Sequence, residues 1–355
     1  MSMLLRSRLP GAGYSAAWRS SLRTTFSSRY AFISQRPFSA TGRIKGSPLN
    51  VDNQPKTGVQ PAYGPIGVTA ALKSSPNDPP PSPTLFAYEF SLADRVALVS
   101  GGHRGLGLEM ALALVEAGAR AVYCVDLPKT PSDEWEAVRR YAGRLAEGGK
   151  TGGEGRLEYV CADVTDQEGM WKLGKTIGDK EGRMDVCVAA AGILREQIDC
   201  LRYPAKQFRQ VMDVNVNGVL FTAQAAGQQM ERFGNGGSIV LVASMSGSIT
   251  NKHHAWTSYN TSKSAVLQMA RSMACELGPR NIRVNSLSPG YIYTNLTAAY
   301  LDTQPHLLEK WAGENPMGRI GRPDELRGVV TWLASDASSF CTGSDILVSG
   351  GHHSW

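Results

Sequence analysis

A tyrosine and a lysine stand four residues apart in the segment Tyr259-Asn260-Thr261-Ser262-Lys263. On a helix this spacing places the phenol and the ammonium group on one face. A free phenol titrates near ~10, too high for base catalysis at neutral pH, but a neighbouring positive charge favours the phenolate. The pair therefore indicates proton transfer with an alcohol or carbonyl oxygen. Because Tyr-x-x-x-Lys occurs often by chance, this interpretation depends on the elements around it.

A glycine-rich turn lies earlier in the chain, with the sequence Ser100-Gly101-Gly102-His103-Arg104-Gly105-Leu106-Gly107. It follows a short apolar run and opens an Ala/Leu/Glu-rich helical segment that extends through Glu116. Glycines let the backbone approach a pyrophosphate, and a helix N-terminus offers free N–H groups and a positive dipole. This context predicts a dinucleotide-binding loop. The residues expected beside the cofactor are Gly101, Arg104, Gly105, Leu106 and Gly107.

An acidic residue, Asp126, ends the next apolar run after this loop. A carboxylate at this place can accept hydrogen bonds from both ribose hydroxyls of NAD and would repel the 2′-phosphate of NADP. Arg104 acts in the opposite direction, since a basic residue in the loop favours the phosphate. We expect the direct repulsion at the ribose to dominate, and the sequence therefore predicts NAD in preference to NADP.

Apolar runs alternate with helical segments from Arg95 to the C-terminus. The expected strands are 96–99, 121–125, 157–161, 184–190, 238–243, 281–287 and 345–348, and the expected helices after the one ending at Glu116 are 166–181, 206–233, 256–278 and 323–335. Continuous apolar strands alternating with helices are typical of a parallel sheet covered on both faces. The sequence thus predicts an α/β fold: one Rossmann-type, doubly wound domain with a seven-stranded sheet. The Gly/Lys-rich segment 147–155 is interpreted as a surface insertion.

These motifs together resemble the short-chain dehydrogenase/reductase superfamily over about residues 90–355. The loop is similar to its Thr-Gly-x-x-x-Gly-x-Gly pattern, with Ser100 in place of Thr. The resemblance implies that Asp163 and Val164 hold the adenine and that Gly192, in Ala189-Ala190-Ala191-Gly192, lies beside the cofactor ribose. The superfamily usually has Asn-Asn-Ala-Gly there. Both asparagines are alanine in this chain, so their side chains cannot support the central strand. The segment from Pro289 and Gly290 to Ile292 and Thr294 would meet the nicotinamide amide.

The resemblance also implies a catalytic tetrad of Asn215, Ser244, Tyr259 and Lys263, in which the asparagine holds a water against the lysine. The serine has an alternative, because the usual thirteen-residue offset from Tyr259 selects Ser246. Alignment of the strand end selects Ser244, which we prefer because a strand fixes position better than a variable loop. Its hydroxyl would stabilise charge on the carbonyl oxygen. Asn215, Tyr259 and Lys263 would also contact the cofactor.

The reaction implied is reversible hydride transfer between NAD(H) and a carbon that carries a hydroxyl or carbonyl group. Within the superfamily, the segments 242–247, 288–294 and 341–351 resemble fungal polyol dehydrogenases of the D-arabinitol 2-dehydrogenase and xylulose/sorbose reductase types, although Ser349 replaces their usual Asp. A pentitol and its 2-ketopentose are thus the expected substrates. Two alternatives remain open: a mitochondrial 3-oxoacyl-carrier-protein reductase and a non-catalytic, cofactor-binding scaffold.

Side chains near the expected substrate include His253 and His254, although solvated loop histidines are the commoner case, and Tyr291, Tyr293 and Asn295. Residues 296–315 are interpreted as a lid. Members of this superfamily usually assemble through two long helices, here 206–233 and 256–278. A homodimer or homotetramer is therefore expected.

The N-terminal 85 residues differ in composition from the rest. Residues 1–50 hold eight basic residues and no acidic one, so that the remainder has 29 basic and 31 acidic residues from totals of 37 and 31. An Arg- and Ser-rich, acid-free leader is typical of a mitochondrial transit peptide. The Arg-x-Phe-x-x-Thr pattern at 36–41 predicts a mature start near Gly46, after a transit peptide of residues 1–45. Residues 46–85 contain nine of the 19 prolines and are expected to be a disordered linker to the matrix enzyme at 86–355.

Composition also narrows the class of protein. The six cysteines show no CxxC spacing, so neither a zinc site nor a disulfide framework is predicted, and we expect no metal. The basic excess belongs to the leader, which gives no reason to expect a nucleic-acid partner. No apolar run approaches the roughly 18 residues of a membrane span. The expected partner is a small alcohol or ketone.

Overall fold

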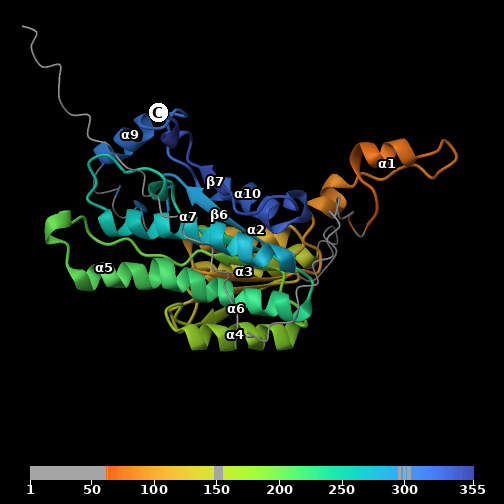
Figure 1. Ribbon diagram of the computed structural model, residues 1–355, viewed down its shortest axis with the longest axis horizontal. Coiled ribbons are helices and arrows are strands. Elements are labelled where there is room, and N and C mark those ends of the chain that lie inside the picture. The colour runs from red at the N-terminus through yellow and green to blue at the C-terminus, as the bar shows by residue number, and fades with distance from the viewer. Residues whose placement is uncertain (1–60, 62, 148–154, 295–296, 299–300, 302–304) are drawn as a thin grey trace, which may run out of the picture. The chain divides into compact units, whose positions relative to one another are not determined.

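The sheet strands are built from short runs of β-branched and apolar residues, most of them buried on both faces. The computed structural model describes residues 61, 63–147, 155–294, 297–298, 301 and 305–355. The strands are β1 (Val96–Ser100), β2 (Ala121–Asp126), β3 (Arg156–Cys161), β4 (Val186–Ala189), β5 (Gly237–Val242), β6 (Ile282–Pro289) and β7 (Asp345–Val348). They form one parallel, seven-stranded sheet (Figure 1), as the sequence predicts.

The order of the strands is β3-β2-β1-β4-β5-β6-β7. The chain therefore moves outward from β1 to β3, returns to the middle, and moves outward again from β4 to β7. In register, Ser100 at the end of β1 lies between Val125 of β2 and Ala189 of β4. The carboxyl ends of these central strands form the crevice where doubly wound sheets bind their ligands.

The helices of the described residues are α1 (Gly67–Lys73), α2 (Gly105–Glu116), α3 (Asp133–Glu147), α4 (Gln167–Glu181), α5 (Ala205–Met212), α6 (Gly218–Phe233), α7 (Thr257–Leu277), α9 (Pro305–Gly313) and α10 (Arg327–Ala334). Six of them cover the two faces of the sheet. One hydrophobic core joins the sheet to α2, α3 and α10, and a second joins its other face to α4, α6 and α7. Figure 1 shows α4, α6 and α7 as neighbours on this second face.

Three expectations need correction. Helix α3 was not expected, although Trp135 and Ala142 face the core at helical spacing. The predicted disordered linker contains helix α1 at residues 67–73 and a π-helical turn that begins at Leu85. The predicted strand 184–190 is shorter, since β4 spans only Val186–Ala189. The leader at 1–45, the start of the linker and most of the insertion at 147–155 lie outside the described residues.

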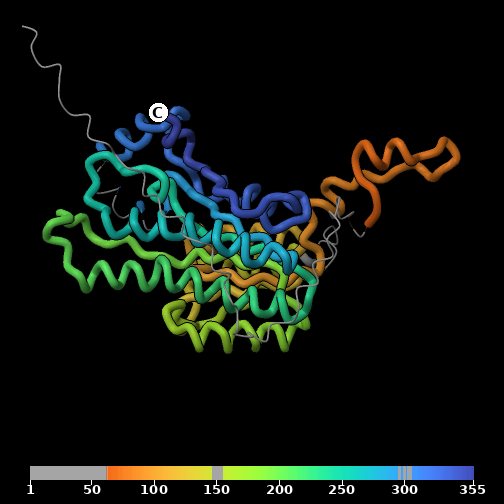
Figure 2. Tube along the Cα trace, in the orientation of Figure 1, coloured from red at the N-terminus to blue at the C-terminus, as the bar shows by residue number. Residues whose placement is uncertain are grey.

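The predicted helix 206–233 is one continuous run with an irregular centre (Figure 2). Helices α5 and α6 are joined by the π-helical turn Asp213–Asn217, which places Asn215 in the middle of the run. A π-turn widens a helix locally and often marks a functional site. Among the described residues, no helix combines the length and apolarity needed to cross a membrane.

Candidate active site

The glycine loop between β1 and α2 needs its glycines for two different reasons. A Cβ on Gly107 would lie 2.1 Å from the carbonyl oxygen of Gly101, and a Cβ on Gly101 would lie 2.8 Å from the nitrogen of Ala191. These two glycines are thus required by close packing. Gly105 has a φ of +58° and no atom within 4 Å of a Cβ position, so it leaves open space at the N-terminus of α2.

The neighbouring side chains leave that open space accessible. Arg104 precedes α2, is exposed and makes no capping hydrogen bond, whereas Leu106 packs against the core behind the loop. An open backbone cradle at a helix N-terminus fits a phosphate group. The residues present therefore fit the pyrophosphate of a dinucleotide.

Asp126 connects this loop to the end of β2. One carboxylate oxygen accepts a hydrogen bond from the backbone N–H of His103 at 3.3 Å, and the other accepts one from Leu127 at 2.9 Å. The His103 ring is held in turn by the Ser132 N–H at 2.9 Å and by an edge contact with Tyr159. A carboxylate has about four lone-pair sites, so Asp126 retains capacity for ribose hydroxyls.

The predicted adenine contacts, Asp163 and Val164, follow β3. The Asp163 carboxylate accepts hydrogen bonds from the N–H and hydroxyl of Thr165 at 2.9 and 2.8 Å, and the side chain is exposed. Val164 is buried, and a Cβ on Gly218 would lie 2.7 Å from its side chain. Val164 thus fixes the loop to α6, while the Asp163 side chain closes a local turn.

Tyr259 and Ser244 lie together beneath this crevice. Burial raises the pKa of Tyr259, and a hydrogen bond with Ser244 acts in the opposite direction. The Tyr259 side chain is half-buried, and the expected lowering of its pKa by Lys263 and a bound nicotinamide stays a prediction. Ser244 also accepts the N–H of Ser246 at 3.1 Å, and both serines are buried. The contact with Tyr259 favours Ser244 over Ser246 as its partner.

Lys263 lies one turn after Tyr259 on α7 and is 4% exposed. Its Nζ donates to the carbonyl oxygen of Val242 at 2.9 Å and lies 5.7 Å from the centroid of the Tyr259 ring. Burial lowers the pKa of Lys263 to about 8. The ammonium group is thus close to the phenol but is held by the strand end of β5.

Asn215 is fully buried, and its side-chain amide makes three hydrogen bonds. Its Oδ1 accepts the N–H of Ile193 at 2.8 Å, and its Nδ2 donates to the Ile193 carbonyl at 2.9 Å and to Ser262 Oγ at 3.0 Å. A Cβ on Gly192 would lie 3.5 Å from Asn215 Oδ1 and 3.6 Å from Lys263 Nζ. The asparagine and the lysine therefore meet at Gly192, as the predicted tetrad requires.

The segment after β6 forms the opposite wall of the crevice. Gly290 donates its N–H to Val348 at 2.9 Å, and a Cβ there would lie 2.6 Å from the Cα of Ser349. Pro289 and Ile292 are buried, and the Thr294 N–H donates to the Thr297 hydroxyl at 2.7 Å. The predicted substrate contact Asn295 lies outside the described residues.

Aromatic rings extend from Tyr259 away from the glycine loop. Trp256 lies 6.4 Å from the Tyr259 ring, and Tyr291 stacks on Trp311 of α9 with centroids 4.2 Å apart. His254 stacks on Trp256 at 4.2 Å and accepts a hydrogen bond from the Trp311 indole at 3.2 Å. Sequence analysis named Tyr291 and His254 but missed the two tryptophans, which are 55 positions apart along the chain and signal no shared site. His253 and Tyr293 are exposed.

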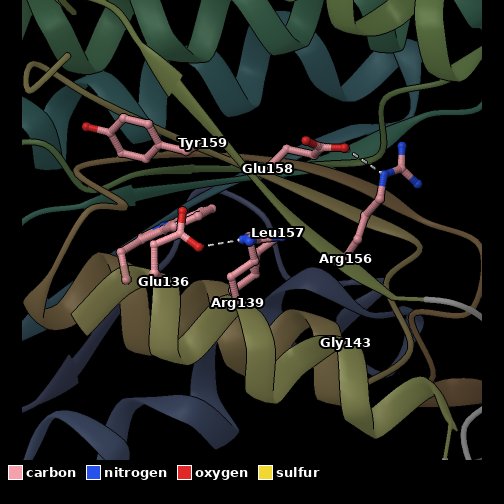
Figure 3. Close-up of a pocket in the computed structure, with 8 residues that line it drawn as sticks. Glu136, Arg139, Gly143, Arg156, Leu157, Glu158 and Tyr159 are labelled. Carbon is pink, nitrogen blue, oxygen red and sulfur yellow. Dashed lines mark hydrogen bonds and ion pairs between the residues drawn. The ribbon is translucent and has the colours of Figure 1, made fainter. Parts of the chain in front are cut away.

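A groove elsewhere on the domain is lined by α3 and the edge strand β3 (Figure 3). Its charged side chains pair with one another, Arg139 with Glu136 at 2.9 Å and Arg156 with Glu158 at 3.0 Å. Tyr159 on its wall contacts the His103 ring. Tyr159 thus connects the groove to the glycine loop, and the tetrad does not line the groove.

Comparison with known proteins extends the sequence evidence. A family model described as enoyl-(acyl carrier protein) reductase matches residues 101–353. A short-chain dehydrogenase/reductase of Aspergillus versicolor is 40% identical over 75% of this chain and 89% of its own length. A sorbose reductase of Schizosaccharomyces pombe is 38% identical, with 74% and 97% coverage. A ribulose-forming D-arabinitol 2-dehydrogenase of Candida tropicalis is 34% identical, with 75% and 95% coverage.

Solved structures agree with these relatives. A short-chain dehydrogenase/reductase from Mycobacterium marinum superposes with a TM-score of 0.66 at 37% identity, covering 75% of this chain and 98% of that one. A gluconate 5-dehydrogenase from Burkholderia cenocepacia, in complex with NADP and tartrate, gives 0.66 at 28% identity with the same coverages. The chain is thus a member of the short-chain dehydrogenase/reductase family, an oxidoreductase that acts on CH–OH groups with a nicotinamide cofactor.

Proposed function

We propose that this protein is an NAD(H)-dependent polyol dehydrogenase that interconverts a pentitol and its 2-ketopentose. The observation that carries the proposal is the buried contact between Tyr259 and Ser244, with Lys263 one helical turn away and Asn215 bound beside Gly192. The relatives named for sorbose and D-arabinitol support the choice of substrate class.

Each side chain has a role that follows from its contacts. The Tyr259 phenol, whose pKa is raised by burial, holds its proton at neutral pH and can give it to a carbonyl oxygen during ketone reduction. Ser244 would hold that oxygen by a hydrogen bond as negative charge develops on it. In the oxidation direction Tyr259 would take up the alcohol proton. When bound, the nicotinamide supplies or accepts the hydride.

Lys263 and Asn215 would act on Tyr259 and the cofactor without touching the reacting carbon. The Lys263 ammonium favours the phenolate by its charge and would bind cofactor hydroxyls. The Asn215 amide binds Ile193 and Ser262 and so fixes the chain around Gly192, and the second lone pair of its Oδ1 would be left for a water. The water-holding role of Asn215 expected from the sequence stays a prediction.

The cofactor would lie across the crevice, with its pyrophosphate over Gly105 and its adenosine ribose at Asp126. Asp163 and Val164 would contact the adenine, and the nicotinamide would lie against Pro289, Gly290, Ile292 and Thr294. We infer a preference for NAD because the Asp126 carboxylate would repel a 2′-phosphate. Some structural relatives contain NADP, so a comparison of kcat/KM for NADH and NADPH tests this preference.

A second function is favoured by the description of the matching family model, which names an acyl-carrier-protein substrate. In this alternative the same tetrad would reduce a 3-oxoacyl thioester. It would bind a long acyl-carrier thioester instead of a hydroxylated chain.

One assay separates these functions. Full-length protein is given NADH with a 2-ketopentose, sorbose or an acetoacetyl thioester, and NAD with D-arabinitol. Our proposal expects turnover of the sugars and the alcohol, with kcat/KM for the 2-ketopentose at least tenfold above that for the thioester. The reverse order would favour the acyl-carrier function. Cofactor binding without turnover of any substrate would indicate a scaffold.

Location and assembly are proposed on narrower grounds. The acid-free, Arg-rich residues 1–50 support import into the mitochondrial matrix, and a reporter fused to residues 1–50 should enter mitochondria. The α5–α6 run and α7 support a homodimer or homotetramer. Light scattering of the purified chain would give a monomer mass if this is wrong.

A further inference from the structure

The loop before α7 contains a buried amide with an unpaired atom. Asn251 is 1% exposed, and its Nδ2 donates to the Tyr291 hydroxyl at 3.1 Å. Its Oδ1 is buried and has no hydrogen-bond partner among the described residues. Buried polar atoms in native proteins are nearly always paired. An acceptor at this place therefore points to a donor from outside the described residues.

The same loop contains His254, and its hydrogen bond to Trp311 fixes which ring nitrogen carries the proton. The Trp311 indole nitrogen can only donate, so His254 Nε2, 3.2 Å away, must accept and carries no proton. The proton of the neutral imidazole is then on Nδ1. Nδ1 is also buried, and among the described residues it has no hydrogen-bond partner. Burial lowers the pKa of His254, which keeps the neutral ring at physiological pH.

These two atoms belong to one turn, since the His254 N–H donates to the Asn251 carbonyl at 3.2 Å. The turn packs among the aromatic rings beside Tyr259: Trp256 stacks on His254, and Tyr291, bonded to Asn251, stacks on Trp311. Aromatic faces suit the C–H groups of a carbon chain. A hydroxyl is a small group that both donates and accepts a hydrogen bond. The chemistry of the cluster thus matches a hydroxylated chain.

We propose that Asn251 and His254 bind hydroxyl groups of the substrate on carbons other than the one that reacts, and so select polyhydroxylated substrates. This inference rests on the proposed polyol dehydrogenase function. Asn251 Oδ1 accepts from a substrate hydroxyl and His254 Nδ1 donates to one. Trp311 fixes the tautomer of His254 and is therefore a positioning residue.

The test uses substitutions that remove one atom of the pair. In His254→Gln the side-chain amide can reach the place of Nε2 and bind Trp311, but the Nδ1 donor is lost. Asn251→Ala removes the acceptor. The control is His253→Asn, because His253 is exposed and has a φ of +65°, which Asn tolerates. Each protein is assayed with NADH and either a 2-ketopentose or 2,3-butanedione, a reactive ketone without hydroxyls.

We expect both loop variants to lower the ratio of kcat/KM for the ketose to that for the dione by roughly three- to tenfold. The loss should lie mainly in the KM for the ketose, while the KM for NADH and the ratio in His253→Asn stay unchanged. If wild-type protein reduces the ketose but both variants have the wild-type ratio of kcat/KM, the inference is wrong. This result is expected if a trapped water pairs with Asn251 Oδ1 and His254 Nδ1. If wild-type protein reduces only the acetoacetyl thioester, the proposed function itself is wrong. Should His254→Gln unfold, the ratio in Asn251→Ala decides.

Discussion

Replacement of Asn215 by alanine tests whether the π-turn is fixed by its side chain. The amide makes three hydrogen bonds, two to the backbone of Ile193 and one to Ser262, at 2.8 to 3.0 Å in a fully buried place. Each is worth about 1 kcal/mol, and truncation leaves its partners unpaired. The higher helix propensity of alanine offsets about 0.6 kcal/mol of this loss. We therefore expect Asn215→Ala to lower the free energy of unfolding by about 2–3 kcal/mol.

The assay is thermal unfolding of the full-length protein, followed by circular dichroism. A loss of this size lowers Tm by about 5–10 °C, taking roughly 2–4 °C per kcal/mol for a domain of this class. Asn217→Ala is the matched control, because Asn217 lies in the same turn but is exposed, and its side chain donates to Asp213 at 3.2 Å. Its Tm should change by no more than about 2 °C. Equal Tm values for the two variants would refute the assigned role of the Asn215 amide.

Three further predictions concern the chemistry. Asp126→Ser should raise the ratio of kcat/KM for NADPH to that for NADH by roughly tenfold or more, since a charge-assisted hydrogen bond and a repulsion are both removed; a wild-type preference for NADPH would contradict the assignment. Ser244→Ala should lower kcat by about 10²–10³ and Ser246→Ala far less; the opposite ranking would exchange the two serines. Because the pKa of Tyr259 is raised and that of Lys263 is lowered to about 8, both groups are protonated at neutral pH. As pH rises through about 8, Lys263 should lose the charge that would bind the cofactor, so the KM for NADH in ketone reduction should rise. Alcohol oxidation needs the Tyr259 phenolate and should increase only well above pH 8, because the pKa of Tyr259 is raised; pH profiles in which oxidation already reaches its plateau below pH 8 would contradict this.

The sheet was predictable because its strands have a strong local signal. Runs such as Val96–Ser100 and Gly237–Val242 are buried along almost their whole length, so hydrophobicity and length identify them without tertiary information. The glycine loop was predictable for a similar reason, because close packing restricts positions such as Gly101 and Gly107 to glycine.

Other features depend on contacts between distant segments. The π-turn at Asp213–Asn217 joins α5 to α6, and its Asn215 is held by Ile193 and Ser262, which lie far from it along the chain. The pairing of His254 with Trp311 joins residues 57 positions apart. Helix α3 was missed for another reason: its mostly polar sequence, with acidic residues in the first turn, leaves a narrow apolar face.

The strand order has a consequence for how this domain can change its specificity. The order in which the strands are added to the sheet reverses between β1 and β4. The residues that would recognise the adenosine lie on the β1–β3 side. Those that would surround the reacting alcohol follow β5 and β6. Substitutions more than about 7–10 Å apart and without shared partners usually have additive effects. Substitutions that change the preference for NAD or NADP should thus leave the preference for the alcohol unchanged, and the reverse should also hold. Exchanging one half of the domain between relatives should alter one preference while preserving the other.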